Sequence, residues 1–220
     1  METKQAKASG GIVRFFSGIG RYLAGLGRDF TQGDLFVKLS ALVCGASCIK
    51  RKQYVKGVLL TLVEALVLWL VPAFFWPYIS KLDTLGTVEA KAVIDKTTRT
   101  KVWNDYDNSF KILLFGVIGL VIIVAAVVLW ARNIRAAREV EMLEKSGKHV
   151  NSFREDVADC LGKKFHRTLL TLPVLGVVCF TVIPLIIMIA VAFTNYDKAH
   201  LPPFNLFTWV GLDNFKNLLS

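Results

Sequence analysis

Residues 168–193 read TLLTLPVLGVVCFTVIPLIIMIAVAF, a run of 26 residues that contains no charged side chain. At a rise of about 1.5 Å per residue, a helix of roughly 20 residues already crosses the hydrocarbon core of a bilayer. The length and apolarity of this run therefore predict a transmembrane helix. Pro173 and Pro184 lie three helical turns apart, so we expect two bends and neighbouring groups that satisfy the carbonyls freed by the prolines.

Two further apolar runs, at residues 57–79 and 112–131, are also long enough to cross a bilayer. The three runs hold most of the apolar excess of this 220-residue chain, which is 54% hydrophobic and has a mean hydropathy of +0.48. This composition excludes a soluble enzyme, a disulfide-stapled secreted module and a disordered tail. The predicted fold is all-α, a polytopic helical membrane protein with three transmembrane helices and an N-terminal amphipathic or interfacial region.

The distribution of basic residues predicts the side of the membrane on which each connecting segment lies. The apolar runs separate an N-terminal region (1–56), a first loop (80–111), a second loop (132–167) and a C-terminal segment (194–220). If these segments alternate sides, the first and third carry 19 of the 27 Lys and Arg residues, and the other two carry 8. The positive-inside rule then predicts a multi-pass protein of the cell membrane with a cytoplasmic N-terminus and an extracellular C-terminal segment. The first apolar run begins too late in the chain for a cleaved signal peptide.

Residues 35–49 form a shorter apolar segment that competes as a fourth span. The segment has only 15 residues and contains Lys38, and a crossing would place the basic cluster at residues 50–56 outside. We therefore favour interfacial or re-entrant packing for it.

Residues 12–28 combine an apolar helical stripe with three arginines at sevenfold spacing. This pattern is typical of an amphipathic helix that lies in the headgroup plane of the membrane. Four glycines weaken the helix prediction, so a poorly ordered basic arm is the alternative.

Glu64 is the one charged residue within the three apolar runs. An ionised carboxylate near the middle of a bilayer costs about 3 kcal/mol, so this group must face protein or water, find a partner, or stay protonated. A hydrogen bond to another helix, or a position near the interface, is favoured over a proton or cation relay because the runs hold no second acid or histidine. In the second run, Gly116 and Gly119 either admit a close neighbouring helix or have no packing role.

The loop at residues 132–167 carries two charge pairs at helical spacing, Glu141 with Lys145 and Glu144 with Lys148. Such pairs indicate that the second span continues as a charged helix facing water, with contact to a partner as the alternative.

Residue patterns for catalysis or metal binding are absent from the sequence. It contains no GxxxxGK[ST] phosphate loop, no GxSxG or HExxH element and no CxxC pair, and its three histidines are dispersed over loops on opposite sides. We therefore predict no catalytic, cofactor-binding or metal-binding residue, and no enzymatic activity.

From residue 164 onward the chain reads KFHRTLLTLPVLGVVCFTVIPLIIMIAVAFTNYDKAHLPPFNLFTWVGLDNF. This text resembles the MalF-like permease subunit of bacterial maltose and maltodextrin ABC transporters of the Gram-positive type. The WVGLDNF element at residues 209–215 is typical of the wider sugar-permease family. Its combination with AFTNYD at 192–197 and the HLPPFNLFTW bridge at 200–209 is more specific for the maltodextrin branch. The likeness extends more loosely back to about residue 30.

The resemblance implies the N-terminal part of an importer permease that helps to form the transmembrane assembly and does not itself hydrolyse ATP. The implied partners are a second permease subunit, an ATP-binding cassette ATPase subunit that uses the ATP, an extracellular sugar-binding lipoprotein and membrane lipid, with no nucleic acid. Family members continue beyond WVGLDNF into the spans that form the sugar path. No substrate-binding residue is therefore carried over, and the substrate-binding residues are unknown.

Two alternatives remain open from the sequence. The segment at residues 195–215 either helps to shape the docking surface for a sugar-binding lipoprotein or is a structured linker, which is slightly favoured. The whole chain is either part of an importer or a small three-span membrane scaffold or assembly protein derived from a truncated permease gene.

Overall fold

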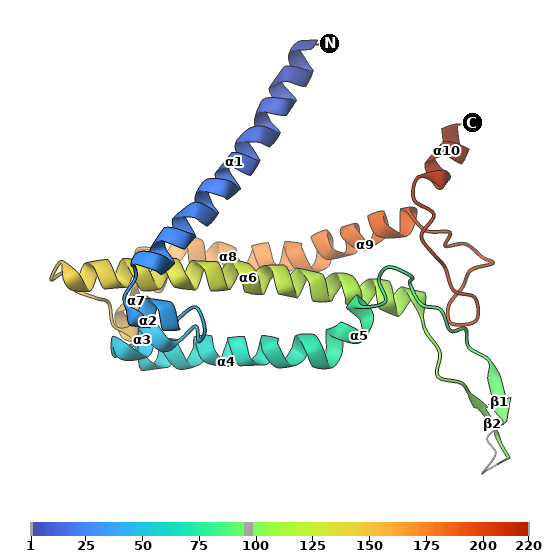
Figure 1. Cartoon of the computed structure of the whole chain (residues 1–220), viewed down its shortest axis with the longest axis horizontal. Coiled ribbons are helices and arrows are strands. Elements are labelled where there is room, and N and C mark those ends of the chain that lie inside the picture. Colours follow the sequence, from blue (N-terminus) through green and yellow to red (C-terminus); the bar gives the residue numbers. More distant parts are fainter. Residues whose placement is uncertain (1, 95–98, 220) are drawn as a thin grey trace. The chain divides into compact units, whose positions relative to one another are not determined.

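Helices dominate the computed structural model, which describes residues 2–94 and 99–219 (Figure 1). Three helical stretches are long and apolar enough to cross a membrane: Tyr54–Ile79, Ser109–Lys145 and Phe165–Ala192. These stretches confirm the predicted all-α fold with three spans. Within the described residues, strand structure is limited to a short antiparallel hairpin, β1 (Ala92–Ile94) with β2 (Lys101–Trp103), and one isolated bridge between Thr194 and Trp209.

The first and third spans each contain a π-helical turn beside a proline. The first span consists of α4 (Tyr54–Leu70), the π-helix η1 (Val71–Phe75) and α5 (Trp76–Ile79), and the third of α8 (Phe165–Val177), η2 (Val178–Val182) and α9 (Ile183–Ala192). A proline donates no hydrogen bond, and its ring crowds the carbonyl four residues earlier, so a wider turn relieves the crowding. Pro72 lies in η1 and Pro184 is the second residue of α9, which follows η2, whereas α8 continues through Pro173.

The chain forms two compact units, and each is described by itself. Unit 1 comprises residues 1–65 and 126–159, and unit 2 comprises residues 66–125 and 160–220. The long helices α4 and α6 (Ser109–Lys145) contribute residues to both units.

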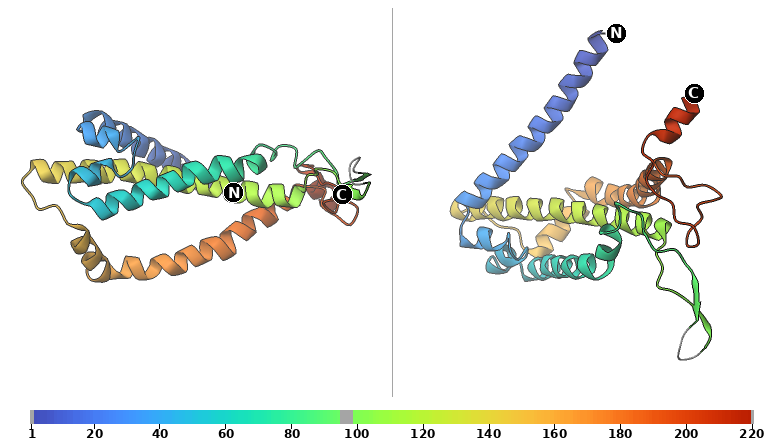
Figure 2. Two further views of the ribbon diagram at one scale, coloured as in Figure 1. Left: turned by 90° about the horizontal axis from the view of Figure 1, so that it is seen from below. Right: turned by 45° about the vertical axis from the view of Figure 1, so that its right-hand side comes forward.

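Unit 1 contains α1 (Glu2–Gln32), α2 (Leu35–Leu39), α3 (Ala46–Lys50), the first turns of α4, the second half of α6 and most of α7 (Phe153–Leu161) (Figure 2). Residues 12–28 therefore lie within one long helix. Residues 35–49 contain two five-residue helices, each far too short to span a bilayer. The buried core joins the end of α1, α2 and α6 through Leu26, Val37, Ala131, Ile134 and Ala137.

Two glycines bring α3 and α4 into backbone contact within unit 1. A Cβ atom at Gly45 would overlap the carbonyl oxygen of Gly57, and a Cβ atom at Gly57 would lie 2.6 Å from a side-chain carbon of Ile49. Only glycine at these positions allows the start of the first span to pack this closely on the preceding short helix.

Unit 2 contains the end of the first span, the first half of α6, the hairpin, α8, α9 and α10 (Asp213–Leu219). Its buried core is formed by Leu85, Ile112, Leu113, Ile187 and Phe207. Gly116 and Gly119 of α6 admit close neighbours. A Cβ atom at Gly116 would lie 2.6 Å from the Leu82 side chain, and a Cβ atom at Gly119 would lie 2.9 Å from Cβ of Phe75. The close-packing interpretation of these two glycines is therefore confirmed.

Candidate functional site

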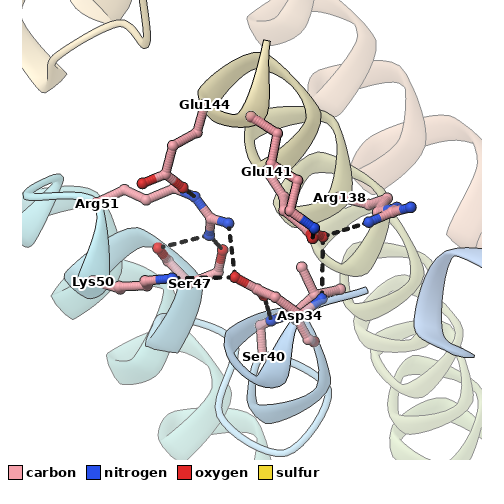
Figure 3. Close-up of polar contacts among 10 residues, drawn as sticks. Asp34, Ser40, Ser47, Lys50, Arg51, Arg138, Glu141 and Glu144 are labelled. Atoms are coloured by element: carbon pink, nitrogen blue, oxygen red, sulfur yellow. Dashed lines mark hydrogen bonds and ion pairs between the residues drawn. The ribbon is translucent and has the colours of Figure 1, made fainter. Parts of the chain in front are cut away.

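The polar centre of unit 1 begins at Asp34, which connects α1 to α2 (Figure 3). Its carboxylate Oδ1 accepts a hydrogen bond from the Val37 amide at 2.7 Å and so caps the N-terminus of α2. The second oxygen, Oδ2, accepts from Lys50 Nζ at 3.2 Å and from Arg51 Nη2 at 3.4 Å. One aspartate therefore begins a helix and also holds the basic end of α3.

Glu141 on α6 is the most buried carboxylate of this centre, with 1% of the residue exposed. Its Oε2 accepts from Arg138 Nη1 at 2.7 Å and from the Asp34 amide at 3.2 Å, and its Oε1 accepts from Lys145 Nζ at 2.5 Å. Two cations and one backbone donor compensate for the loss of water around this charge.

The predicted character of this part of α6 is corrected by these contacts. The helix does continue to Lys145, and the Glu141–Lys145 pair is present, but its carboxylate faces protein and not water. In place of the expected bond with Lys148, Glu144 Oε2 accepts from Arg51 Nε at 3.0 Å. The spacing along the helix identified the ionisable residues. It could not reveal that Arg51, about 90 residues earlier in the chain, is the partner of Glu144.

Arg51 completes the network, and only 3% of its side chain is exposed. Its guanidinium donates to Asp34, to Glu144, and to both the hydroxyl and the carbonyl of Ser47. Because the planar group binds three segments at once, it fixes α2, α3 and the end of α6 against one another.

A cavity of about 210 Å³ lies beside this network. Its wall is mostly apolar in character and includes Leu60 of α4 together with Leu129 and Val140 of α6. Three cations, from Arg51, Lys56 and Arg132, line it together with polar groups, whereas no acidic residue does. Such a lining favours a ligand with a negative charge and an apolar part.

Glu64 of the first span also finds a partner within unit 1. Its Oε2 accepts a hydrogen bond from the backbone amide of Cys44 at 2.8 Å. Glu64 therefore has a hydrogen-bond partner, but the predicted bond to another helix is not what forms: the donor belongs to the turn before α3.

In unit 2, the motifs that carry the family resemblance pack against each other. Asn195 pairs with Thr208 by two hydrogen bonds, one from its own amide to the Thr208 carbonyl and one from the Thr208 amide to its Oδ1. The Asn214 side-chain amide donates to the carbonyls of Ala192 and Thr194 at 3.0 and 2.7 Å and so closes the end of α9. These motif residues therefore build one folded segment.

Aromatic residues of the same motifs anchor this segment to the rest of unit 2. Trp209 Nε1 donates to the carbonyl of Leu82 at 2.7 Å. Phe207 is completely buried in the core of unit 2, and its ring meets Tyr196 at a centroid distance of 5.3 Å. The conformation of residues 194–215 thus depends on the loop that follows the first span.

Asp107 organises that loop and was not identified from the sequence. Its carboxylate accepts from Lys81 Nζ at 2.5 Å and from the amides of Thr87 and Val88 at 2.9 and 3.2 Å. Burial alone raises the pKa of Asp107, but these three hydrogen bonds outweigh it and hold the pKa below its usual value. The sequence signal nearby is Gly86, whose φ of +101° is readily adopted only by glycine.

Within the described residues, no group of three or more His, Cys, Asp or Glu side chains could hold a metal ion. The polar centres in both units are built from ion pairs and hydrogen bonds that stabilise the fold. Each centre adjoins a cavity, the one described above in unit 1 and one of about 340 Å³ beside Lys81 and Asp107 in unit 2.

The chain is similar to permease proteins of bacterial oligosaccharide transport systems. The maltodextrin transport system permease protein MalC of Streptococcus pneumoniae is 31% identical over 183 residues, which cover 83% of this chain and 39% of the relative. The maltodextrin transport system permease protein MdxF of Bacillus subtilis is 28% identical over 181 residues, or 82% of this chain and 38% of the relative. These matches confirm the resemblance drawn from the sequence motifs.

A third relative is named for a different sugar. The galactooligosaccharides transport system permease protein GanP of Bacillus subtilis is 26% identical over 190 residues, which cover 83% of this chain and 40% of the relative. The chain thus spans about 40% of the length of the curated relatives it matches. No protein-family model and no solved structure matches it.

Proposed function

We propose that this chain forms part of the permease subunit of an ABC importer for maltose- or maltodextrin-type carbohydrates. The observation that carries the proposal is the 31% identity over 183 residues to a maltodextrin permease protein. In this role the chain helps to build the transmembrane assembly, and a partner ATPase subunit hydrolyses the ATP. A second permease subunit and an extracellular sugar-binding lipoprotein complete the proposed set of partners.

The proposed orientation in the plasma membrane places the network around Glu141 and the N-terminus on the cytoplasmic side. The segments at residues 80–111 and 194–220 then face outward. This assignment is supported by the 19 basic residues on one set of segments against 8 on the other.

The packing of the motif residues supports a scaffold role for this part of the permease. Asn214, Trp209 and Phe207 direct their side chains into contacts within unit 2, so their first effect is to shape the outer segment. In the proposed importer, this shaped segment contributes to the surface that faces the sugar-binding lipoprotein.

A chimeric permease tests the proposal. The stretch of the Bacillus subtilis MdxF permease that matches this chain is replaced by the chain, and the chimera is produced in a strain that lacks the native permease. We expect uptake of radiolabelled maltodextrin above that of the deletion strain. A parallel chimera with GanP, assayed with labelled galactooligosaccharide, should give lower uptake if the chain is adapted to the maltodextrin system.

Immunoblots of the membrane fraction provide the control, because both chimeras must be present at comparable amounts. If both are inserted and neither restores uptake, the importer proposal is wrong, and the three-span scaffold alternative is favoured instead. Higher uptake by the GanP chimera would retain an importer role and overturn the maltodextrin assignment.

A further inference from the structure

We propose that the cavity of unit 1 binds the headgroup phosphate of an anionic phospholipid, with Arg132 as its main cationic contact. The proposal concerns lipid recognition and does not depend on which solute the protein helps to transport.

The cavity lies where two spans change from apolar to basic. On α4, Leu60 is one turn away from Lys56, and on α6, Leu129 is about one turn away from Arg132. All four residues line the same cavity, so the change from apolar to basic residues on α4 lies beside the same change on α6. Next to Leu129 in the sequence, Trp130 donates its indole N–H to the carbonyl of Ala41 at 2.7 Å, and tryptophan is enriched at the membrane interface.

Of the three cations that line the cavity among the described residues, two already have partners and one is available to a ligand. Arg51 is fully engaged by the buried network, and Lys56 Nζ lies 3.1 Å from the carboxylate of Asp156. Arg132 is exposed, and in the part of the chain that the structure describes it makes neither an ion pair nor a hydrogen bond. Its planar guanidinium can bind two phosphate oxygens at once.

The apolar wall distinguishes a lipid from a free anion. A hydrated phosphate ion gains nothing from contact with Leu60, Leu129 and Val140, whereas the glycerol and first methylene groups of a lipid do. The volume of about 210 Å³ corresponds to about seven water molecules, which is enough for a headgroup phosphate but not for a whole lipid. The acyl chains would continue along α4 and α6, where Leu59, Val63 and Val128 are exposed.

Lipid titration of the purified full chain in a neutral detergent tests the site. The unfolding midpoint is followed by tryptophan fluorescence while phosphatidylglycerol, phosphatidylcholine or inorganic phosphate is added. We expect a saturable rise with phosphatidylglycerol alone, because a ligand that binds the folded state raises its midpoint. Arg132→Gln should weaken the apparent affinity about fivefold, which is the contribution of one basic residue at an anionic surface.

Two further variants separate the cavity from general surface charge. Arg154→Gln removes one positive charge from another exposed arginine that does not line the cavity, and it should leave the affinity unchanged. Ala136→Trp leaves the charge unchanged but fills the cavity, so it should abolish the saturable rise. Because Ala136 is exposed, the variant should still unfold cooperatively in phosphatidylcholine.

Three results would overturn the proposal. An equal rise with inorganic phosphate would indicate a small-anion site, and an equal rise with phosphatidylcholine would indicate a general lipid effect. Equal affinities for Arg132→Gln and Arg154→Gln, or an unchanged response of Ala136→Trp, would place the bound lipid elsewhere on the chain.

Discussion

Glu141 illustrates at the residue scale how burial changes the role of a charged side chain. By its spacing to Lys145 it is an ordinary helix-surface residue, yet its carboxylate is almost completely enclosed and accepts hydrogen bonds from three donors. A buried charge of this kind contributes little net stability as a pair, but removal of one partner leaves the others unsatisfied. The stability of unit 1 should therefore be most sensitive to substitutions that remove a single member of the network.

Replacement of Glu141 by alanine should destabilise the chain by about 3 kcal/mol, because Arg138 and the Asp34 amide, both partly buried, lose their acceptor. Glu141→Gln should cost less, since its amide oxygen still accepts. The free energy of unfolding in mixed micelles, followed by circular dichroism, measures both effects.

Glu139→Ala is the matched control for this prediction. Glu139 lies on the same helix, is exposed and makes no ion pair or hydrogen bond among the described residues. Its loss should change the free energy of unfolding by less than about 0.5 kcal/mol. Equal losses for Glu139→Ala and Glu141→Ala would contradict the importance of the buried network.

Asp107 makes the stability of unit 2 depend on pH. Its folded-state pKa is lowered, since the hydrogen bonds from Lys81 and from the amides of Thr87 and Val88 outweigh the effect of burial. The resulting stabilisation is complete above the unfolded-state pKa of about 3.9 and is lost as the pH falls through the lower folded-state pKa. The unfolding midpoint of the wild type should therefore decrease more than that of Asp107→Asn when the pH falls from about 6 to about 3.

The neighbouring Asp105 supplies the comparison for this pH dependence. It is exposed and makes no hydrogen bond within the described part of the chain. Asp105→Asn should thus follow the wild-type pH profile. A wild-type profile that coincides with that of Asp107→Asn would show that the carboxylate does not act as proposed.

At the scale of the helices, glycine determines how closely the second span packs on its neighbour. Of the apolar stretch of the second span, 22% is buried within the chain, against 6% for each of the other two spans, so the second span makes the most extensive contacts. Gly119 faces Phe75 with no room for a methyl group, whereas a Cβ atom at Gly176 of the third span would meet nothing within 4 Å. A glycine-to-alanine substitution should therefore destabilise the chain at Gly119 but not at Gly176.

Gly119→Ala should lower the free energy of unfolding by about 1–2 kcal/mol, because the added methyl group forces α6 and the end of the first span apart. Gly176→Ala should leave it unchanged or raise it by up to about 1 kcal/mol, since alanine favours a helix more than glycine does. Unfolding in the same mixed micelles compares the two variants directly. A loss of similar size in both would contradict the close packing at Gly119.

At the scale of the whole molecule, the lipid bilayer determines on which side of the membrane each connecting segment lies. Three apolar helices separate segments that differ strongly in basic content, and many of their apolar side chains, such as Leu62, Leu66 and Leu172, are exposed. The proposed orientation follows from the cost of moving Lys and Arg clusters across the bilayer.

Thiol labelling of intact cells tests this orientation. Cys160 is exposed in the segment proposed to be cytoplasmic, so a membrane-impermeant maleimide should reach it only after permeabilisation. A cysteine introduced by Lys198→Cys, in a background that lacks the four native cysteines, should be labelled without permeabilisation. The reverse labelling pattern would invert the topology and the proposed location of the lipid site.

The sequence by itself determined the class of the protein, the number of its spans and its relatives. The length of residues 112–131 and the absence of charge within them suffice to predict a span, because helix rise and bilayer thickness are independent of any tertiary contact. The motifs near residues 192–215 likewise sufficed to identify the permease resemblance that the comparisons confirm.

Only the tertiary structure decided which polar groups are buried and which side chains meet. Asp34 and Glu141 are 107 residues apart, and Asn195 meets Thr208 only because the chain reverses between them. Likewise, Leu60, Leu129 and Arg132 line one cavity only because the start of α4 packs beside the second half of α6. Hydrophobic length and periodicity are local properties of the chain, whereas burial and pairing depend on distances between segments that no local pattern specifies.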